Sequence, residues 1–134
     1  MKVKENGIRI LPALIAILVF TIGCSVASKL NNQNTNVSDV AQHFANNGYE
    51  GNFKEEPLAI AIAGMEQAGE LKGKGFDIKI VKWQMNGIDE VMRKLNHTYS
   101  LMGKKEARLF GKGYFSVEVV EGDSSEIGRI FERM

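Results

Sequence analysis

The residues that could do chemistry in this chain are few and scattered. The two histidines, His43 and His97, fall in segments expected to form different helices, where a helix-flank position is favoured over a metal ligand or a general base. The acidic pairs 55–56 and 89–90 are adjacent in sequence, so on a strand or a helix their carboxylates point apart and cannot act as an acid–base pair. We therefore predict no enzyme activity, no metal site and no cofactor.

One basic and aromatic cluster stands out from this background. Lys72, Lys74, Lys79 and Lys82 lie close together in sequence, with Trp83 beside them. Such a cluster can bind a carboxylated or phosphorylated ligand, and we take Lys74, Lys79, Lys82 and Trp83 as the candidate contact residues. The favoured alternative is that lysines protect an edge hairpin against strand pairing.

Composition limits the class of protein. A chain of 134 residues that is 44% hydrophobic and 25% charged has room for one globular domain. When the charged residues among the first nine are left out, 14 basic and 15 acidic residues remain. This balance argues against nucleic acid as a partner.

The amino-terminal residues have the order of an export signal. Lys2, Lys4 and Arg9 precede an uncharged run over 10–22, and the next charge is Lys29. Positive residues ahead of an apolar run keep that end cytoplasmic and direct the rest of the chain outward. We therefore expect an exported protein.

Three fates of the signal are consistent with the sequence. Thr21-Ile22-Gly23-Cys24 resembles the lipobox of small bacterial lipoproteins of unknown function, although Leu is usual where Thr21 stands. The resemblance implies lipidation of Cys24 and a membrane anchor at the periplasmic or extracellular face. Alternatively, cleavage after Ser25-Val26-Ala27 would release a soluble protein that begins at Ser28, or the apolar segment stays as an uncleaved anchor.

These features divide the chain into three parts. Residues 1–23 form the signal peptide, which in the alternative is cleaved near residue 27. The polar residues 24–37 are expected to form a flexible tether, and 38–134 a single small domain.

Apolar periodicity predicts the elements of that domain. Ser38 is expected to cap a first helix, and alternation over 76–81 predicts a strand. Trp83 falls out of this phase, which indicates either a bulge or the end of the strand near Val81. The apolar stripe over 88–102 predicts an amphipathic helix. The remaining predictions are a hairpin formed by 107–110 and 114–120, a final helix capped by Asp123 or Ser124, and a helix, favoured over a strand, at 57–64.

Together these elements predict an α+β fold. We expect an antiparallel sheet of about four strands with two to four helices packed on one face, and an open second face carrying Asp77, Lys79, Ser116 and Glu118. Gly73 to Arg93 and Gly111 to Arg129 share the order turn, strand, helix, which is consistent with a ββα duplication or with convergence.

The predicted function is non-enzymatic binding in the cell envelope. The partner is a protein or another envelope component, met through the open sheet face or a sheet edge, while lipidated Cys24 or an uncleaved amino-terminal segment holds the domain at a membrane. The alternative is an exported module for small molecules or anions that uses the lysine-rich hairpin near Trp83.

Overall fold

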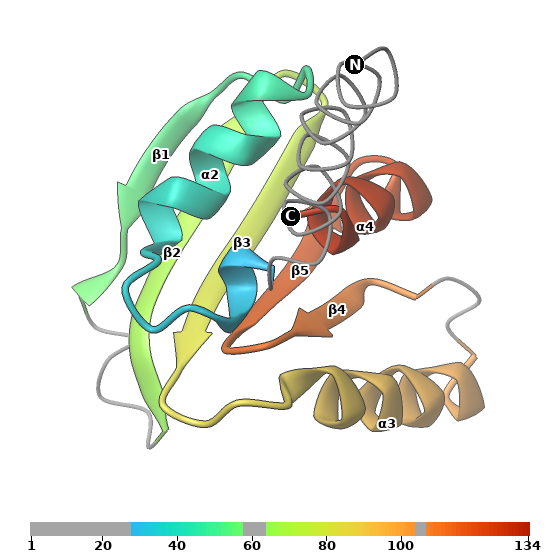
Figure 1. Ribbon diagram of the computed structural model, residues 1–134. Helices are drawn as coiled ribbons and strands as arrows, with labels where there is room; N and C mark the ends of the chain where they lie inside the picture. The colour runs from blue at the N-terminus through green and yellow to red at the C-terminus, as the bar shows by residue number, and fades with distance from the viewer. Residues whose placement is uncertain (1–27, 58–63, 104–106) are drawn as a thin grey trace, which may run out of the picture.

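The computed structural model describes residues 28–57, 64–103 and 107–134 (Figure 1). Cys24, the predicted signal peptide and most of the predicted helix at 57–64 therefore lie outside the described residues. Within the described ranges, no helix is long and apolar enough to cross a membrane. The elements in chain order are η1 (Lys29–Asn31), α2 (Val37–Asn46), β1 (Asn52–Glu55), β2 (Met65–Gly73), β3 (Phe76–Trp83), α3 (Ile88–Leu101), β4 (Leu109–Lys112), β5 (Phe115–Glu121) and α4 (Ser124–Glu132).

The strands form one antiparallel sheet in the order β1-β2-β3-β5-β4. This confirms the predicted α+β class, with five strands in place of about four. Two strands lack a predicted range. Strand β2 was expected only as the partner of 76–81 in the lysine-rich hairpin, and β1 is a four-residue edge strand whose sequence, Asn52 to Glu55, has only one apolar residue. A strand this short and polar has no periodicity of its own, and its pairing with β2 defines it.

The core lies on one face of the sheet. Ile78 and Ile80 of β3 and Val117 of β5 point to this face and are buried. From the helix layer, Phe44 of α2 and Phe131 of α4 are buried against them. Each such side chain contributes about 1.5–3 kcal/mol on burial, so this layer supplies most of the domain's stability.

Two-residue turns close both hairpins. Gly73 pairs with Phe76 across Lys74-Gly75, where Gly75 has a φ of +79°. Lys112 pairs with Phe115, so the second turn is Gly113-Tyr114, later than the predicted Gly111-Lys112-Gly113. Gly113, with a φ of +60°, supplies the left-handed conformation that such a turn favours.

The start of α2 is determined by a tertiary contact that the sequence does not reveal. The helix begins at Val37 with Asn36 as N-cap, in place of the predicted Ser38. The Asn36 amide donates to Asp39 Oδ2 (2.7 Å), and the Val37 amide donates to the side-chain oxygen of Gln67 on β2 (3.2 Å). By contrast, of the two predicted caps of α4, Asp123 is the one observed, since its carboxylate accepts from the Glu126 amide (3.1 Å).

Helix α3 packs mainly on β4, at one edge of the sheet (Figure 1). The side-chain amide of Asn96 donates to the Leu109 carbonyl (2.5 Å), and its oxygen accepts from the Leu109 amide (3.1 Å). A Cβ on Gly111 would lie 2.7 Å from the Ile88 carbonyl oxygen, so only glycine permits this approach. The side chain of Asn96 thus occupies the backbone amide and carbonyl of Leu109, with which a further strand would otherwise pair.

The two predicted ββα units occur in the structure, but their helices pack differently. Hairpin β2–β3 is followed by α3, and hairpin β4–β5 is followed by α4. Helix α4 buries Ile127, Ile130 and Phe131 in the core, whereas Ile88 and Met92, the buried apolar residues of α3, lie outside that core cluster. The repeated order therefore does not produce a repeated packing arrangement.

The described part of the predicted tether is folded onto the domain. Leu30 of η1 is fully buried in the core, and its carbonyl accepts from the Tyr114 amide (2.9 Å). Thr35 is also buried, and its hydroxyl donates to the Lys29 carbonyl (2.7 Å). The structure thus differs from the prediction of a flexible tether over 24–37, because residues 28–37 are part of the packed domain.

Tyr49 connects α2 to the start of α4. Its ring packs edge-on against Phe44 and Phe76, with centroids 6.4 and 5.1 Å away. Burial, followed by the hydrogen bond to Glu126 and the negative charges of Glu126 and Asp123, raises the pKa of Tyr49 from 10.0 to about 12. The folded state therefore favours the neutral phenol.

We expect Tyr49→Phe to change how stability depends on alkaline pH. Because the pKa of Tyr49 is higher in the folded state, its contribution is complete below pH 10 and is lost as pH rises from 10.0 to about 12. The difference in unfolding free energy between wild type and Tyr49→Phe should shrink across that window in urea titrations. This difference in unfolding free energy should stay constant between about pH 7 and pH 9. A difference that stays constant up to about pH 12 would contradict the raised pKa of Tyr49.

Candidate binding surface

The alternation of β3 separates the residues of the predicted basic and aromatic cluster. Lys79 and Trp83 are on one face of the sheet, while Lys82 is in phase with Ile78 and Ile80 on the core face. Lys74 lies in the turn at the other end of the strand, about 30 Å from Trp83 at 3.3 Å per residue. The structure does not bring Lys74, Lys79, Lys82 and Trp83 together at one site.

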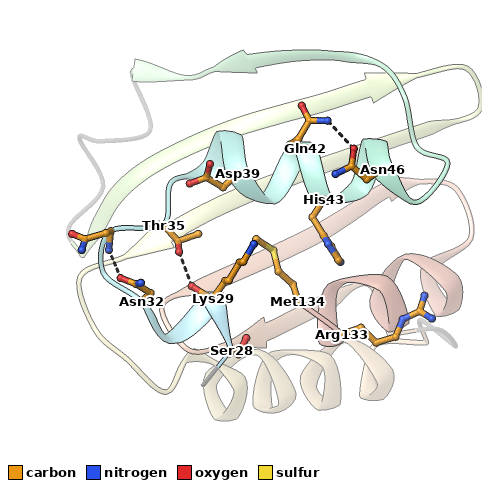
Figure 2. Close-up of a pocket in the computed structure, with 11 residues that line it drawn as sticks. Ser28, Lys29, Asn32, Thr35, Asp39, Gln42, His43, Asn46, Arg133 and Met134 are labelled. Atoms are coloured by element: carbon orange, nitrogen blue, oxygen red, sulfur yellow. Dashed lines mark hydrogen bonds between the residues drawn. The ribbon is translucent and has the colours of Figure 1, made fainter. Parts of the chain in front are cut away.

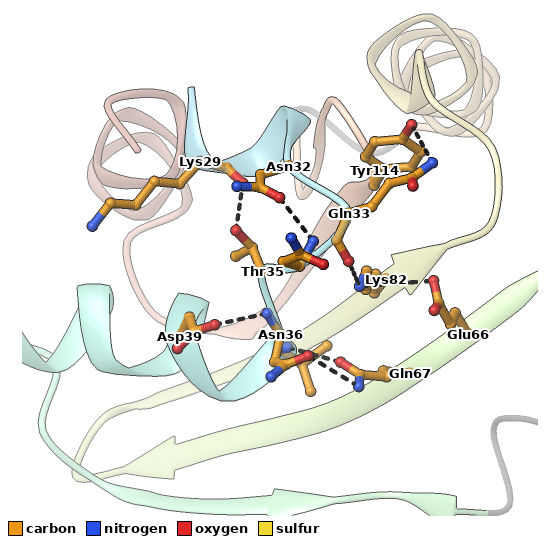
Figure 3. A network of polar contacts seen from close by, with 12 residues as sticks. Lys29, Asn32, Gln33, Thr35, Asn36, Asp39, Glu66, Gln67, Lys82 and Tyr114 are labelled. Carbon is orange, nitrogen blue, oxygen red and sulfur yellow. Dashed lines mark hydrogen bonds and ion pairs between the residues drawn. The ribbon is translucent and has the colours of Figure 1, made fainter. Parts of the chain in front are cut away.

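Lys82 is a buried structural residue (Figure 3). Its side chain is only 3% exposed, and Nζ donates to the Gln33 carbonyl (2.5 Å) and lies 3.8 Å from the Glu66 carboxylate. An ammonium group removed from water needs such partners, since an isolated buried charge costs several kcal/mol. Lys82 therefore holds the segment before α2 against the sheet and is not available to an external ligand.

Gln33 and Gln67 extend the contacts of Lys82 on both sides (Figure 3). The Gln33 side chain donates to the Tyr114 hydroxyl (3.0 Å), and Gln67 Nε2 donates to the Asn36 side chain (3.3 Å). Neither Gln33 nor Gln67 belongs to a sequence motif that marks it. The one local indication was Leu30, an apolar residue directly before the polar run 31–36.

Trp83 lies on the sheet face opposite α2 and α4. Its indole Nε1 donates to the Ser116 hydroxyl of β5 (2.8 Å), which explains why Ser116 is buried although it lies on the predicted open face. Cross-strand pairing places Ala68, Val81, Ser116 and Gly111 in one row beside Trp83. This part of the face is mostly small or apolar.

The rest of the open face carries alternating charges. Lys54, Glu70, Lys79 and Glu118 occupy facing positions on four neighbouring strands. Opposite charges at facing positions stabilise a sheet by about 0.2–1 kcal/mol per pair. The predicted exposure is confirmed for Lys79 and Glu118, and the alternation gives this face no large field of one sign.

Asp77 behaves differently from its predicted neighbours on the open face. It pairs with Lys72 and Glu121 on the adjacent strands, yet it is buried, and its Oδ1 has no hydrogen-bond partner among the residues described. A strand irregularity follows it, where the register shifts between Asp77 and Ile78. Asp77 is therefore not part of the accessible charged row.

Helix α3 carries a group of exposed apolar side chains. The α3 patch is defined by Val91, Leu95, Tyr99, Leu101 and Met102. Leu101 and Met102 are 76% and 74% exposed, and Val120 on β5 is also exposed. The predicted apolar stripe over 88–102 is thus only partly buried, at Ile88 and Met92, and the rest of its apolar surface is exposed.

A polar groove of about 760 Å³ opens on the helix side of the molecule (Figure 2). It lies between the segment that begins at Ser28, helix α2 and the end of the chain. Residues lining it include Ser28, Lys29, Asn32, Thr35, Asp39, Gln42, His43, Asn46, Arg133 and Met134. Amide and hydroxyl side chains dominate this lining, so it fits a hydrated polar surface better than an apolar ligand.

His43 has a structural role in the groove wall. Its Nε2 donates to the Ile130 carbonyl (2.8 Å) and so connects α2 to α4. Across residues 28–57, 64–103 and 107–134, no group of three His, Cys, Asp or Glu side chains could hold a metal ion. The open sheet face, the α3 patch and the groove thus offer polar, charged and apolar side chains for contact with a partner.

Comparison of the chain with models of known protein families, with curated proteins and with solved structures gives no significant match.

Lys82→Ala should destabilise the fold by about 1–3 kcal/mol, because it removes a buried side chain and leaves the Gln33 carbonyl without its donor. The matched control is Lys79→Ala on the same strand, which is exposed and should change stability by about 0.5 kcal/mol or less. Chemical denaturation measures both variants. Equal losses in the two variants would show that Lys82 is not a structural contact.

Proposed function

We propose that the protein is a membrane-tethered, non-enzymatic binding domain of the cell envelope that contacts a partner protein through its open sheet face. The observation that carries this proposal is the asymmetry of the sheet. Residues 28–37, α2 and α4 bury one face, while the other presents Lys79 and Glu118 to solvent. Helix α3 approaches this second face beside Gly111 of β4, while the part that carries the charged row is left for contact.

A protein partner fits this face better than a small ligand. The row Lys54, Glu70, Lys79 and Glu118 alternates in sign, and the apolar groups Val81 and Val120 lie on the same face. Mixed charges around apolar groups are typical of protein interfaces, where complementary charges orient the partner.

The face is also favoured over the sheet edges. At β4, the Leu109 backbone groups are already bonded to Asn96. Edge strand β1 has only four residues and carries Lys54 and Glu55, charged residues that discourage strand addition.

The alternative, an anion-binding module, lacks a convergent site. It requires Lys74, Lys79 and Lys82 to surround one ligand near Trp83, whereas Lys82 points into the core and Lys74 lies at the far end of β3. No observation favours it over the protein-binding proposal.

The location is proposed on the amino-terminal sequence. The positive residues, the apolar run over 10–22 and the lipobox-like Thr21-Ile22-Gly23-Cys24 support export and anchoring at the periplasmic or extracellular face. Lipidation at Cys24 would hold the domain at the membrane, because each buried methylene of an acyl chain contributes about 0.8 kcal/mol.

Site-specific photocrosslinking in the envelope of the producing cell tests the proposed contact. A photoreactive phenylalanine at Lys79 or Val120, both exposed on the open face, should give a discrete protein adduct. The matched control position is Gln42, which is exposed on the groove side of α2 and should give none. Adding Lys79→Glu, which places three acidic residues side by side in the charged row, should weaken the adduct formed from Val120.

Two outcomes would contradict the proposal. One is the absence of a protein adduct from Lys79 and Val120 in a folded, correctly located protein. The other is an adduct from Gln42 alone, which would place the partner on the helix side.

A further inference from the structure

The packing of residues 28–37 limits the length of the linker to the proposed anchor. Leu30 is buried in the core, and the Lys82 ammonium holds the Gln33 carbonyl. The Leu30 carbonyl accepts from the Tyr114 amide, and Gly113 approaches this carbonyl so closely that a Cβ would collide with it. The chain is thus packed onto the domain from Leu30 onward, and only four peptide steps separate Ser28, the first residue described, from Cys24.

This linker is short compared with the domain. Four residues span at most about 14 Å when fully extended. A globular domain of about 100 residues has a radius of gyration of about 13 Å and therefore a diameter well above that length. A domain held by such a linker cannot rotate freely, so the side that carries Ser28 stays next to the membrane.

Ser28 identifies which side this is. It lies at the polar groove together with Lys29, Gln42 and Arg133, on the face of the sheet covered by helices (Figure 2). Lys79 and Trp83 are on the opposite face. The groove and the open sheet face thus point in opposite directions.

We propose that the groove side rests on the lipid headgroup layer and that the open sheet face points away from the membrane toward the partner. This inference rests on the proposed anchoring at Cys24. The groove offers cations at Lys29 and Arg133, an anion at Asp39 and several amides, which match zwitterionic, hydrated headgroups. Because the short linker and not net charge places the domain, the contact should persist at high salt.

The single tryptophan of the chain allows a direct test by fluorescence. The full-length protein, with acyl mass at Cys24 verified by intact mass spectrometry, is reconstituted in phosphatidylethanolamine and phosphatidylglycerol vesicles that contain a lipid with a headgroup spin label. Native Trp83 should be quenched weakly. Gln42→Trp in a Trp83→Phe background, which places the indole on the groove side, should be quenched severalfold more.

A lengthened linker provides the matched control. Insertion of a long flexible Gly/Ser segment between Cys24 and Ser28 should abolish the difference in quenching between the two tryptophan positions. In the protein without this insertion, 1 M NaCl reduces the Debye length to about 3 Å and should leave the difference in quenching unchanged. Strong quenching at the groove position with the long linker would contradict the linker mechanism, because it would show that surface affinity is sufficient.

The outcomes separate this inference from the proposed function. Equal quenching at both positions in an acylated protein would overturn the orientation and leave the anchored binding domain intact. A wild-type protein that carries no acyl mass and leaves the membrane on washing would overturn the anchoring and with it the orientation.

Discussion

The ammonium of Lys82 is the group on which the arrangement of this domain depends. It sits on the buried face of the central strand β3, where burial of an unpaired charge would be costly. Its partners are the Gln33 carbonyl, from the segment before α2, and the Glu66 carboxylate of β2. The hydrogen bond of this ammonium therefore requires the amino-terminal segment to lie on the sheet, with Leu30 in the core.

That constraint also divides the molecule into two functional sides. With residues 28–37, α2 and α4 on one face, the helix side contains the polar groove, and the chain leaves this side at Ser28. The other face keeps the alternating row from Lys54 to Glu118 and the indole of Trp83, while α3 with its exposed apolar patch lies at the sheet edge. An anchor near Ser28 and a contact surface on the opposite face are compatible, because neither uses the groups of the other.

The sequence predicted those elements whose local periodicity and packing agree. Alternation over 76–81 and at 115–119, the stripe over 88–102 and the cap at Asp123 all correspond to observed elements. Of the two predictions for the end of this strand, an end near Val81 was wrong, because Lys82 continues the buried phase with a charged side chain. The alternative, a bulge, corresponds to the register shift between Met65 and Gln67 on β2, opposite Trp83 and Lys82. Apolar periodicity cannot identify a buried lysine whose partners are distant in sequence.

Other features also depended on contacts between distant residues. Strand β1 is defined by its pairing with β2, and the position of α3 depends on Asn96 and on the close approach at Gly111. The polar run 31–36 has the composition of a tether, but a carbonyl, a hydroxyl and two amide side chains within residues 28–37 are bonded to the rest of the fold or to one another. The grouping of Lys74, Lys79, Lys82 and Trp83 was based on sequence proximity alone, whereas strand alternation places neighbours on opposite faces.

Residues 28–37 are an integral part of the folded domain, and the division into two sides depends on their packing. Amide hydrogen exchange on the full chain measures this directly, since the Val37 amide bonds to Gln67 and the Tyr114 amide to Leu30. The structure predicts that these two amides exchange about as slowly as those of β3 and β5. Exchange of residues 30–37 at the rate of an unstructured peptide, with β3 and β5 still protected, would contradict it.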